Sequence, residues 1–308
     1  MPDKRSYSYF IAGMIICLLG AVCFSTKAII VKLAYRDTAV DSITLLALRM
    51  LFSLPFFVVS AIYSSNKNEN VRFTGRQWIA VAVIGCLGYY VSSLLDFLGL
   101  QYVSAGIERL VLFVYPTLVL FISALIFKTK IKVLQWVAVV ITYIGLFVAF
   151  WGEVSFQENS DDFVKGTLLI FVCAVTYALY IVGSGRLIPS LGAAKFNSYA
   201  MSFASVAVLI HFIVTSENSL FGQSRTIYVY SFLMAVLSTV IPSYLVTEGI
   251  KRIGSGNAAI VGSIGPISTI LQAYFFLQEP IHAFQLVGTG LILAGVFIIG
   301  YRKRTGLE

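Results

Sequence analysis

Several charged side chains lie inside the long apolar segments of this 308-residue chain. A charge at membrane depth costs about 2.5–3.5 kcal/mol on insertion scales, so a residue that keeps one there needs a functional explanation first. The deepest of these positions are Lys27, Lys32, Arg49, Asp96, Glu108, Arg109 and Glu248. All but the last fall in the first half of the chain, so we expect ion pairing and solute contact to be concentrated there.

Asp96 ends a polar stripe on a predicted helix. Three polar residues precede it by seven, four and three positions: Tyr89, Ser92 and Ser93. These spacings share one helical face, and a polar stripe on a membrane helix lines a cavity. The alternative is a structural ion pair of Asp96 with Arg49 or Lys27. The pattern leaves both interpretations open, so Asp96, Tyr89 and Ser93 are candidates for solute binding or coupling.

Glu108 and Arg109 are neighbours near the start of another predicted helix. Adjacent helical residues point about 100° apart, so one of them faces a cavity while the other meets a neighbouring helix. Glu108 is the better candidate proton site, because burial favours the protonated form of a carboxylate. Its alternatives are an ion pair with Arg49 or Lys27 and exposure near the outer surface. Arg49 and Arg109 are the candidates for structural ion pairs.

Lys27 and Lys32 lie on the first predicted helix at different depths. Lys27 is seven residues from the predicted end of that helix, too deep for its ammonium to reach water easily. We expect it to be the counter-charge for an anionic group of a solute or for Glu108. Lys32 is close to the outer end, where its side chain is expected to extend to the interface.

Aromatic and amide side chains on other predicted helices are candidates to complete a solute site. They are Phe24, Tyr177, Tyr180, Tyr244 and Gln272. Aromatic walls with a few polar groups suit an amphipathic organic solute. The chain has 17 Tyr and 24 Phe, however, so the alternative for each aromatic is packing or a place in an interfacial belt.

Composition indicates that the solvent of this chain is a lipid bilayer. Hydrophobic residues make up 58% and charged residues 12%, about half the charged share of a soluble domain. The net charge is +8, but the basic residues stand between apolar runs, so we expect them to orient the chain and not to bind nucleic acid. The four cysteines form no C-x-x-C motif and the two histidines are far apart, so no metal or cofactor is expected.

The apolar runs predict an all-α membrane protein with ten transmembrane helices. Each run is close to the roughly 20 residues that a span needs. The predicted spans are 9–34, 42–63, 77–99, 103–127, 133–151, 164–184, 196–215, 227–249, 255–277 and 283–301. With this assignment fifteen Lys and Arg residues lie on the side of the two termini and three on the other. The positive-inside rule therefore predicts a multi-pass inner-membrane protein with both termini in the cytoplasm.

An internal repeat divides the chain. A shift of 150 residues aligns residues 102–150 with 252–300 without a gap and places Pro116 on Pro266. We therefore predict two five-helix repeats, 1–151 and 152–308; five spans are an odd number, so the second repeat has inverted topology. The two prolines lie inside predicted helices, which they interrupt or kink. Such breaks often border the binding site of a carrier; the alternative is a tolerated kink.

Short motifs in a fixed order resemble the drug/metabolite transporter superfamily, and within it the ten-helix EamA-type carriers. The motifs are Gly20–Lys27, Leu46–Arg49, Gly99–Tyr102, Tyr115–Thr117, Gly254–Ala259, Pro266 and Leu277–Pro280. The resemblance spans nearly the whole chain. It implies export or exchange of amino acids, metabolites or toxic organic compounds, with a central site formed chiefly by spans 1, 3, 4, 6, 8 and 9.

These features together predict a secondary transporter that moves a small organic solute by alternating access, expected to be an exporter. No P-loop is present, so the drive is expected to be a proton gradient or the solute gradient itself. The alternatives are a channel or facilitator, a membrane-embedded sensor, and an intramembrane enzyme, for which no paired aspartates, Ser/His pair or H-E-x-x-H motif is found. The expected partners are the solute and the lipid bilayer; the sequence does not determine the oligomeric state.

Overall fold

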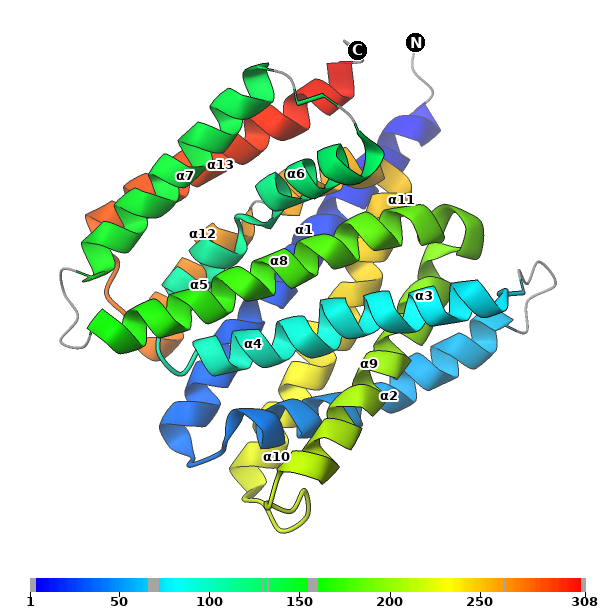
Figure 1. Ribbon diagram of the computed structural model, residues 1–308, viewed down its shortest axis with the longest axis vertical. Coiled ribbons are helices and arrows are strands. Elements are labelled where there is room, and N and C mark those ends of the chain that lie inside the picture. Colours follow the sequence, from blue (N-terminus) through cyan, green and yellow to red (C-terminus); the bar gives the residue numbers. More distant parts are fainter. Residues whose placement is uncertain are drawn as a thin grey trace.

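The structure is a computed structural model that describes residues 4–65, 72–128, 130–131, 133–154, 160–262 and 264–305 (Figure 1). The described ranges contain helices and their connections and no strand. The α-helices are α1 (Lys4–Asp37), α2 (Ser42–Ser65), α3 (Gly75–Gly85), α4 (Ser92–Gly99), α5 (Ala105–Leu112), α6 (Tyr115–Phe127), α7 (Val133–Val154), α8 (Ser160–Leu191), α9 (Ala193–Thr215), α10 (Arg225–Ala235), α11 (Ile241–Gly262), α12 (Ile264–Gln272) and α13 (Ala283–Thr305). Three π-helical segments are η1 (Cys86–Val91), η2 (Val236–Val240) and η3 (Ala273–Leu277).

Seven helical stretches in the described ranges are long and apolar enough to cross a membrane. They are Ser8–Asp37, Ser42–Ser65, Gly75–Gly99, Ala105–Ile126, Asp161–Ile188, Ala193–Thr215 and Arg225–Val246. Three shorter apolar helices, Val133–Ala149, Ile264–Leu277 and Ala283–Gly295, lie where three further spans are expected. The all-helical membrane fold is confirmed, whereas the exact count of ten spans stays a prediction.

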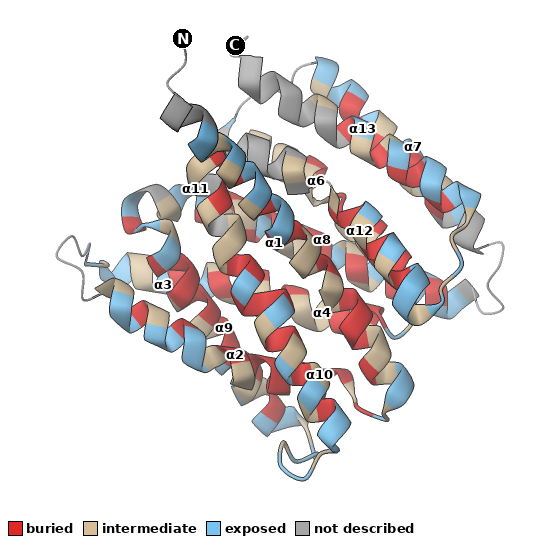
Figure 2. Ribbon diagram, turned by 180° about the vertical axis from the view of Figure 1, so that it is seen from behind, coloured by how far each residue is buried: buried red, intermediate tan, exposed pale blue. Residues whose placement is uncertain are grey.

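The outer surface of the bundle is apolar. Large hydrophobic side chains are strongly exposed on it, among them Leu125 at 82%, Val133 at 80% and Ile213 at 75%. Figure 2 shows buried residues on the facing sides of the helices and exposed ones on their outer sides. Water would penalise such a surface, and lipid tails would not, so these faces are the lipid-facing faces of the bundle.

Two of the π-helical segments occupy repeat-related positions. Segment η1 starts at Cys86 and η2 at Val236, which is 150 residues later and matches the shift of the sequence repeat. Each lies in the middle of a span, between α3 and α4 and between α10 and α11. A π turn widens a helix locally and often occurs at a functional site. In both halves it therefore changes the helical face presented to the centre of the bundle.

A helix break accompanies Pro116. The span predicted at 103–127 is interrupted at Phe113 and Val114, so that Pro116 is the second residue of α6. Proline lacks the N–H that the interior of a helix needs, and its ring fits the first turn, which explains why a new helix starts just before Pro116. Its repeat-related partner Pro266 lies in α12, and residue 263, which precedes that helix, lies outside the described residues.

One predicted connection is absent. The sequence indicates a break between spans 8 and 9 at about 250–254, but the backbone stays helical from Ile241 to Gly262. This stretch has Pro242 in its first turn and no proline later. Glycine weakens a helix without removing a backbone donor, so Gly254 does not end it.

The two ends of the bundle differ in their packing. Figures 1 and 2 place the start of α1 and the end of α13 at one end, which we call the terminal end. There α1 packs against α11 almost backbone to backbone: a Cβ added to Gly20 would lie 2.8 Å from Val246 Cγ2, and one on Gly249 would lie 2.8 Å from Cys17 Cβ. Only glycine allows this approach. We call the opposite end, where α1 meets α2 and α4 meets α5, the loop end.

Candidate functional site

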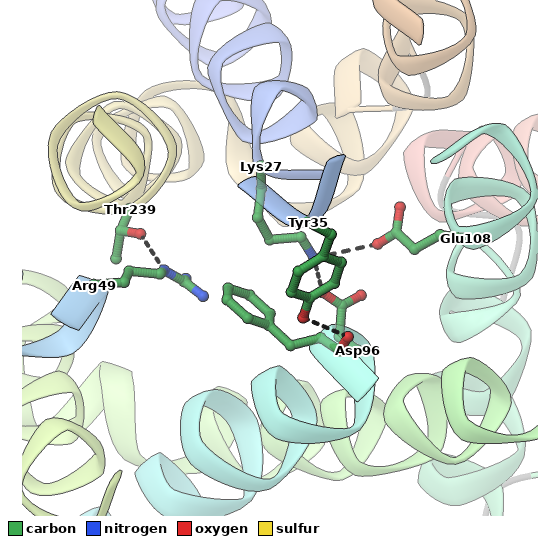
Figure 3. Close-up of polar contacts among 7 residues, drawn as sticks. Lys27, Tyr35, Arg49, Asp96, Glu108 and Thr239 are labelled. Carbon is green, nitrogen blue, oxygen red and sulfur yellow. Dashed lines mark hydrogen bonds and ion pairs between the residues drawn. The ribbon is translucent and has the colours of Figure 1, made fainter. Parts of the chain in front are cut away.

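A buried cluster of three charged side chains lies where α1, α4 and α5 meet (Figure 3). The Nζ atom of Lys27 is 2.7 Å from Asp96 Oδ2 and 3.2 Å from Glu108 Oε1. The exposed fraction is 15% for the lysine side chain, 1% for Asp96 and 0% for Glu108. We call these three residues the ion cluster. It brings together three of the seven charged candidates that the sequence placed at membrane depth.

Local structure fixes each member of the ion cluster. Glu108 is in the first turn of the short helix α5, which starts because the Ser104 hydroxyl accepts a hydrogen bond from Ile107 N at 3.2 Å. Asp96 lies in the middle of α4, directly after the π turn η1. Lys27 lies ten residues before the end of α1, so its ammonium stays inside the bundle.

The ion cluster holds more carboxylate than cation. One ammonium contacts two carboxyl groups, and Asp96 Oδ1 and Glu108 Oε2 are buried without a hydrogen-bond partner among the described residues. An unpaired charge in such a place is costly. A proton on one carboxyl, or a cationic group of a solute, would complete the cluster. The described part of the chain shows no group of three or more His, Cys, Asp or Glu side chains that could hold a metal ion.

Arg49 lies close to the ion cluster without joining it. Its Nε donates to Thr239 Oγ1 at 2.8 Å, and its guanidinium carbon lies 5.5 Å from the centre of the Phe97 ring. Figure 3 shows the side chain extended toward Thr239. The predicted ion pair of Arg49 is thus not among its contacts with described residues. The hydrogen bond joins α2 of the first half to η2 of the second.

Arg109 points away from the ion cluster, as its position next to Glu108 requires. Its guanidinium packs against α12, where a Cβ added to Gly265 would lie 2.5 Å from Nη2. Its Nε is buried and has no hydrogen-bond partner within the described ranges, so the ion pair predicted for it is not observed there. The carbonyl of Gly265 accepts a hydrogen bond from Ser25 at 3.2 Å. Gly265 is therefore a close contact between the two halves.

Four tyrosines form a second group, which we call the tyrosine cluster: Tyr89, Tyr115, Tyr177 and Tyr180. The rings of Tyr115 and Tyr177 have centroids 5.2 Å apart, those of Tyr177 and Tyr180 5.7 Å, and those of Tyr180 and Tyr89 4.9 Å. The Tyr89 hydroxyl lies 3.1 Å from that of Tyr180 and donates to Asn197 Oδ1 at 3.4 Å. The cluster thus combines apolar ring faces with hydroxyl groups.

The two clusters are neighbours along the interface of α4 and α8. A hydrogen bond of 2.7 Å between the hydroxyls of Ser92 and Thr176 lies between them. Seven residues separate Tyr89 from Asp96, which corresponds to about 10 Å along a helix. Asp96 is nearer the loop end.

The remaining candidates lie elsewhere or contribute no observed contact. Tyr244 packs on Phe57 with ring centroids 6.0 Å apart and lies 3.4 Å from the Ser198 hydroxyl. Gln272 donates to Ser268 on its own helix at 2.9 Å. Phe24 and Ser93 are partly buried on α1 and α4, each three residues before a member of the ion cluster.

A cavity of about 530 Å³ opens at the loop end. Its walls come from the end of α1, the turn between α4 and α5 and the segment after η3, and they include Lys32, Arg36, Leu100, Leu277 and Glu279. We call this cavity the vestibule. It begins five residues along α1 from Lys27, which is about 7.5 Å. Beyond the ion cluster lie the tyrosine cluster and the closed seam of α1 and α11, since Tyr89 and Gly20 are each seven positions from a member of the ion cluster.

Sequence reasoning missed three contributors to this arrangement. The backbone acceptors of Lys32 were not predicted: its Nζ donates to Leu100 O at 3.2 Å and Val103 O at 3.0 Å. Thr239, the hydrogen-bond partner of Arg49, carries no charge and belongs to no motif, so no sequence pattern indicated it. Tyr115 is part of the motif that contains Pro116, and its position could have been used to predict an aromatic side chain at the site.

Comparison with known proteins gives consistent results. The EamA-like transporter family model matches residues 11–151 and 164–301. "Uncharacterized transporter YcbK" of Bacillus subtilis is 34% identical over 306 residues, covering 96% of this chain and 95% of that protein. "Uncharacterized inner membrane transporter YicL" of Salmonella typhimurium is 22% identical over 294 residues, with 95% and 96% covered. One crystal structure, 17% identical, superposes with a TM-score of 0.67 over 96% of this chain and 98% of that one, which shows the shared fold.

Proposed function

Because this chain belongs to the EamA-like transporter family, we propose that it is a secondary carrier that exports a small organic solute across the cytoplasmic membrane in exchange for protons. The observation that carries the proposal is the ion cluster, in which Lys27 lies between Asp96 and Glu108. No covalent step is needed, since the site only has to bind, release and change its exposure.

The charge of the ion cluster supports proton exchange. With both carboxyl groups ionised, its three groups sum to one negative charge in a region of low dielectric. A proton on Glu108 neutralises it, and so does an amino or other cationic group of a solute near the same carboxylate. Because either one relieves the same unpaired charge, the two compete for the cluster. Competition of this kind couples the outward movement of solute to the inward movement of protons.

Two other charged side chains, those of Arg49 and Arg109, lie near the carboxylates of the ion cluster. Arg49 from α2 is held by Thr239 and Phe97, and Arg109 is turned toward α12. Neither contacts Asp96 or Glu108 as an ion pair among the described residues. Lys27 is therefore the cation that responds directly when one carboxyl gains or loses a proton.

The packing of the two ends supports alternating access. At the terminal end α1 and α11 touch at Gly20 and Gly249, whereas the vestibule opens the loop end. One helix of this seam comes from each predicted repeat. Rocking the halves would part the seam and close the vestibule, which exposes the clusters to the other side. The bias of Lys and Arg favours a cytoplasmic terminal end, so on this proposal the vestibule faces outward.

The decisive experiment uses the full chain, purified and reconstituted in liposomes. A thermal-shift screen with amino acids, nucleosides, sugars and organic cations selects the solute with the largest stabilisation, which then serves as the labelled probe. We expect saturable counterflow and, with an inward-directed proton gradient, accumulation of the solute against its gradient. Glu108→Gln makes the cluster permanently neutral, so it should keep counterflow within a few-fold and lose accumulation driven by the proton gradient.

Glu217→Gln is the matched control, because it removes the same charge from an exposed residue in the connection between α9 and α10, outside both clusters. It should transport like the unmodified chain. Flux that neither saturates nor shows counterflow would favour a channel and contradict the carrier. Accumulation by Glu108→Gln equal to that of the control would contradict proton exchange at this residue.

A further inference from the structure

The vestibule is lined by two side chains of opposite charge. Lys32 and Glu279 both line it, and they form no ion pair with one another among the described residues. They lie 247 positions apart in the sequence, one on α1 and the other after η3. Opposite charges that share a cavity usually pair, so what holds these two apart is informative.

Backbone groups fix each charge on its own wall. The Lys32 ammonium donates to the carbonyls of Leu100 and Val103, at the C-terminal end of α4. An ammonium has three donors, so one remains for another acceptor. Glu279 Oε1 accepts from Ala105 N at 3.2 Å, at the start of α5. Its second oxygen keeps its full capacity to accept.

The rest of the lining is suited to a small organic molecule. Arg36 at the mouth is already paired with Asp37, whose Oδ1 lies 2.8 Å from Arg36 Nε, so Lys32 is the cation that faces the vestibule without a carboxylate partner among the described residues. Apolar wall comes from Val40, Leu100 and Leu277. The volume of about 530 Å³ lies within the range of about 300–1,000 Å³ that is usual for ligand sites.

We propose that the vestibule is an outer binding site for a zwitterionic solute with an aliphatic side chain, of the α-amino acid class. Lys32 binds the carboxylate, Glu279 binds the ammonium group, and the apolar wall receives the side chain. The proposal rests on the proposed carrier function and adds a site separate from the ion cluster, at which solute waits before entry or after release.

Helix capping alone accounts for only part of this arrangement. It explains why Lys32 bonds to carbonyls at the end of α4 and why Glu279 bonds to an N–H at the start of α5. It does not require the two charges to face one cavity. The two explanations predict different ligand preferences. If Lys32 and Glu279 only cap helices, their replacement affects the binding of all ligands alike, whereas a zwitterion site distinguishes ligands by their charges.

Calorimetric titration of the full chain in phosphatidylglycerol nanodiscs tests this with three probes of one carbon skeleton. They are L-leucine, 4-methylpentanoate, which lacks the amino group, and isoamylamine, which lacks the carboxylate. We expect L-leucine to bind at least tenfold more tightly than either analogue, since each analogue loses one charge-assisted hydrogen bond. Lys32→Met should make L-leucine and isoamylamine bind equally well, and Glu279→Gln should do so for L-leucine and 4-methylpentanoate.

Two further variants guard against misfolding and general charge effects. Lys32→Arg keeps the cation and should keep the preference for L-leucine. Lys165→Met removes an exposed positive charge outside the vestibule, where the residue bonds to Tyr102, and should bind like the unmodified chain. Nanodiscs that also contain phosphatidylethanolamine distinguish a free solute from a lipid headgroup of the same charges. Unchanged L-leucine affinity in these mixed nanodiscs supports a site for a free solute. A tenfold weaker affinity would show that the lipid headgroup competes and would assign the site to lipid.

Equal affinity for all three probes would overturn the proposal. So would equal loss of affinity for all three in Lys32→Met and Glu279→Gln, because that is the result of a capping role only. Either result leaves the liposome experiment unaffected if a different solute shows accumulation that depends on Glu108. A failure of the vestibule site is in this way distinguishable from a failure of the carrier proposal.

Discussion

The ion cluster and the tyrosine cluster lie about 10 Å apart along α4 and differ in how complete they are. In the ion cluster two buried carboxyl oxygens have no hydrogen-bond partner among the described residues, and one lysine serves two carboxyl groups. In the tyrosine cluster two ring pairs meet edge to face and one is stacked, and the Tyr89 hydroxyl has partners in Tyr180 and Asn197. The first cluster contains charged groups without a full set of partners, whereas the second is neutral and its rings pack against each other.

This difference separates two tasks of a carrier. An unbalanced charge responds strongly to a proton or to a charged group, which suits coupling. A neutral aromatic wall responds mainly to shape and apolar area, which suits recognition of the solute. Changes in the ion cluster should therefore alter the dependence on pH, whereas changes in the tyrosine cluster should alter affinity or stability without it.

Lys27→Met should have the largest effect. It leaves Asp96 and Glu108 facing each other without a cation, and removing one partner of a buried ion pair costs about 3–5 kcal/mol. The expected loss in the free energy of unfolding should shrink as the pH falls, because protonation removes the carboxylate charges that repel each other. Unfolding by sodium dodecyl sulfate in mixed micelles at several pH values measures it.

The double variant Lys27→Met/Glu108→Gln is the control for this explanation. With only Asp96 left to carry charge, it should recover part of the lost stability, and its stability should depend less on pH. A double variant as unstable as the single one at every pH would show that Lys27 acts by packing and would remove the contrast between the two clusters.

Thr239→Val should have an intermediate effect. The change keeps the size of the side chain but removes the acceptor of the Arg49 Nε hydrogen bond. Hydrogen bonds to charged groups contribute about 1.5–3 kcal/mol, so a stability loss of that size is expected at every pH. Thr239→Ser keeps the hydroxyl and should lose less. If accumulation driven by the proton gradient also disappeared in Thr239→Val, Arg49 would belong functionally to the ion cluster.

Tyr89→Phe should have the smallest effect. It removes one hydroxyl from the tyrosine cluster and keeps the ring packing against Tyr180. A neutral hydrogen bond contributes about 1 kcal/mol net, so the midpoint of unfolding should shift slightly and alike at all pH values. Accumulation driven by the proton gradient should persist. A changed response to pH would mean that the two clusters do not divide their tasks as proposed.

Much of the architecture was accessible from the sequence. Apolar runs located the spans, because a bilayer demands long apolar helices, and the cost of buried charge singled out Lys27, Asp96 and Glu108. Their meeting point depends on how α1, α4 and α5 pack, which no local pattern contains. Tyr89 also lies within the π turn η1 and Asp96 in α4, so the regular spacing assumed for that stripe does not hold.

Other features were hidden because they depend on distant parts of the chain. Arg49 was expected to seek a carboxylate, yet Thr239 is its partner, 190 positions away and in the other half. The backbone carbonyls that hold Lys32 at the turn after α4 were not predicted either. Helix ends present such carbonyls only once the fold exists, so a sequence pattern does not reveal them.

The glycine contacts between α1 and α11 have a consequence for leakage. Van der Waals attraction fades within a fraction of an ångström, so a seam built on Gly20 and Gly249 loses its contacts together when it parts. Long, flexible side chains would instead change conformation and stay in contact across a widening gap, which would leave the gate partly sealed. A seam of this kind favours a shut or a fully parted gate over a half-parted one, and an exchanger with few half-parted states wastes few protons through slippage.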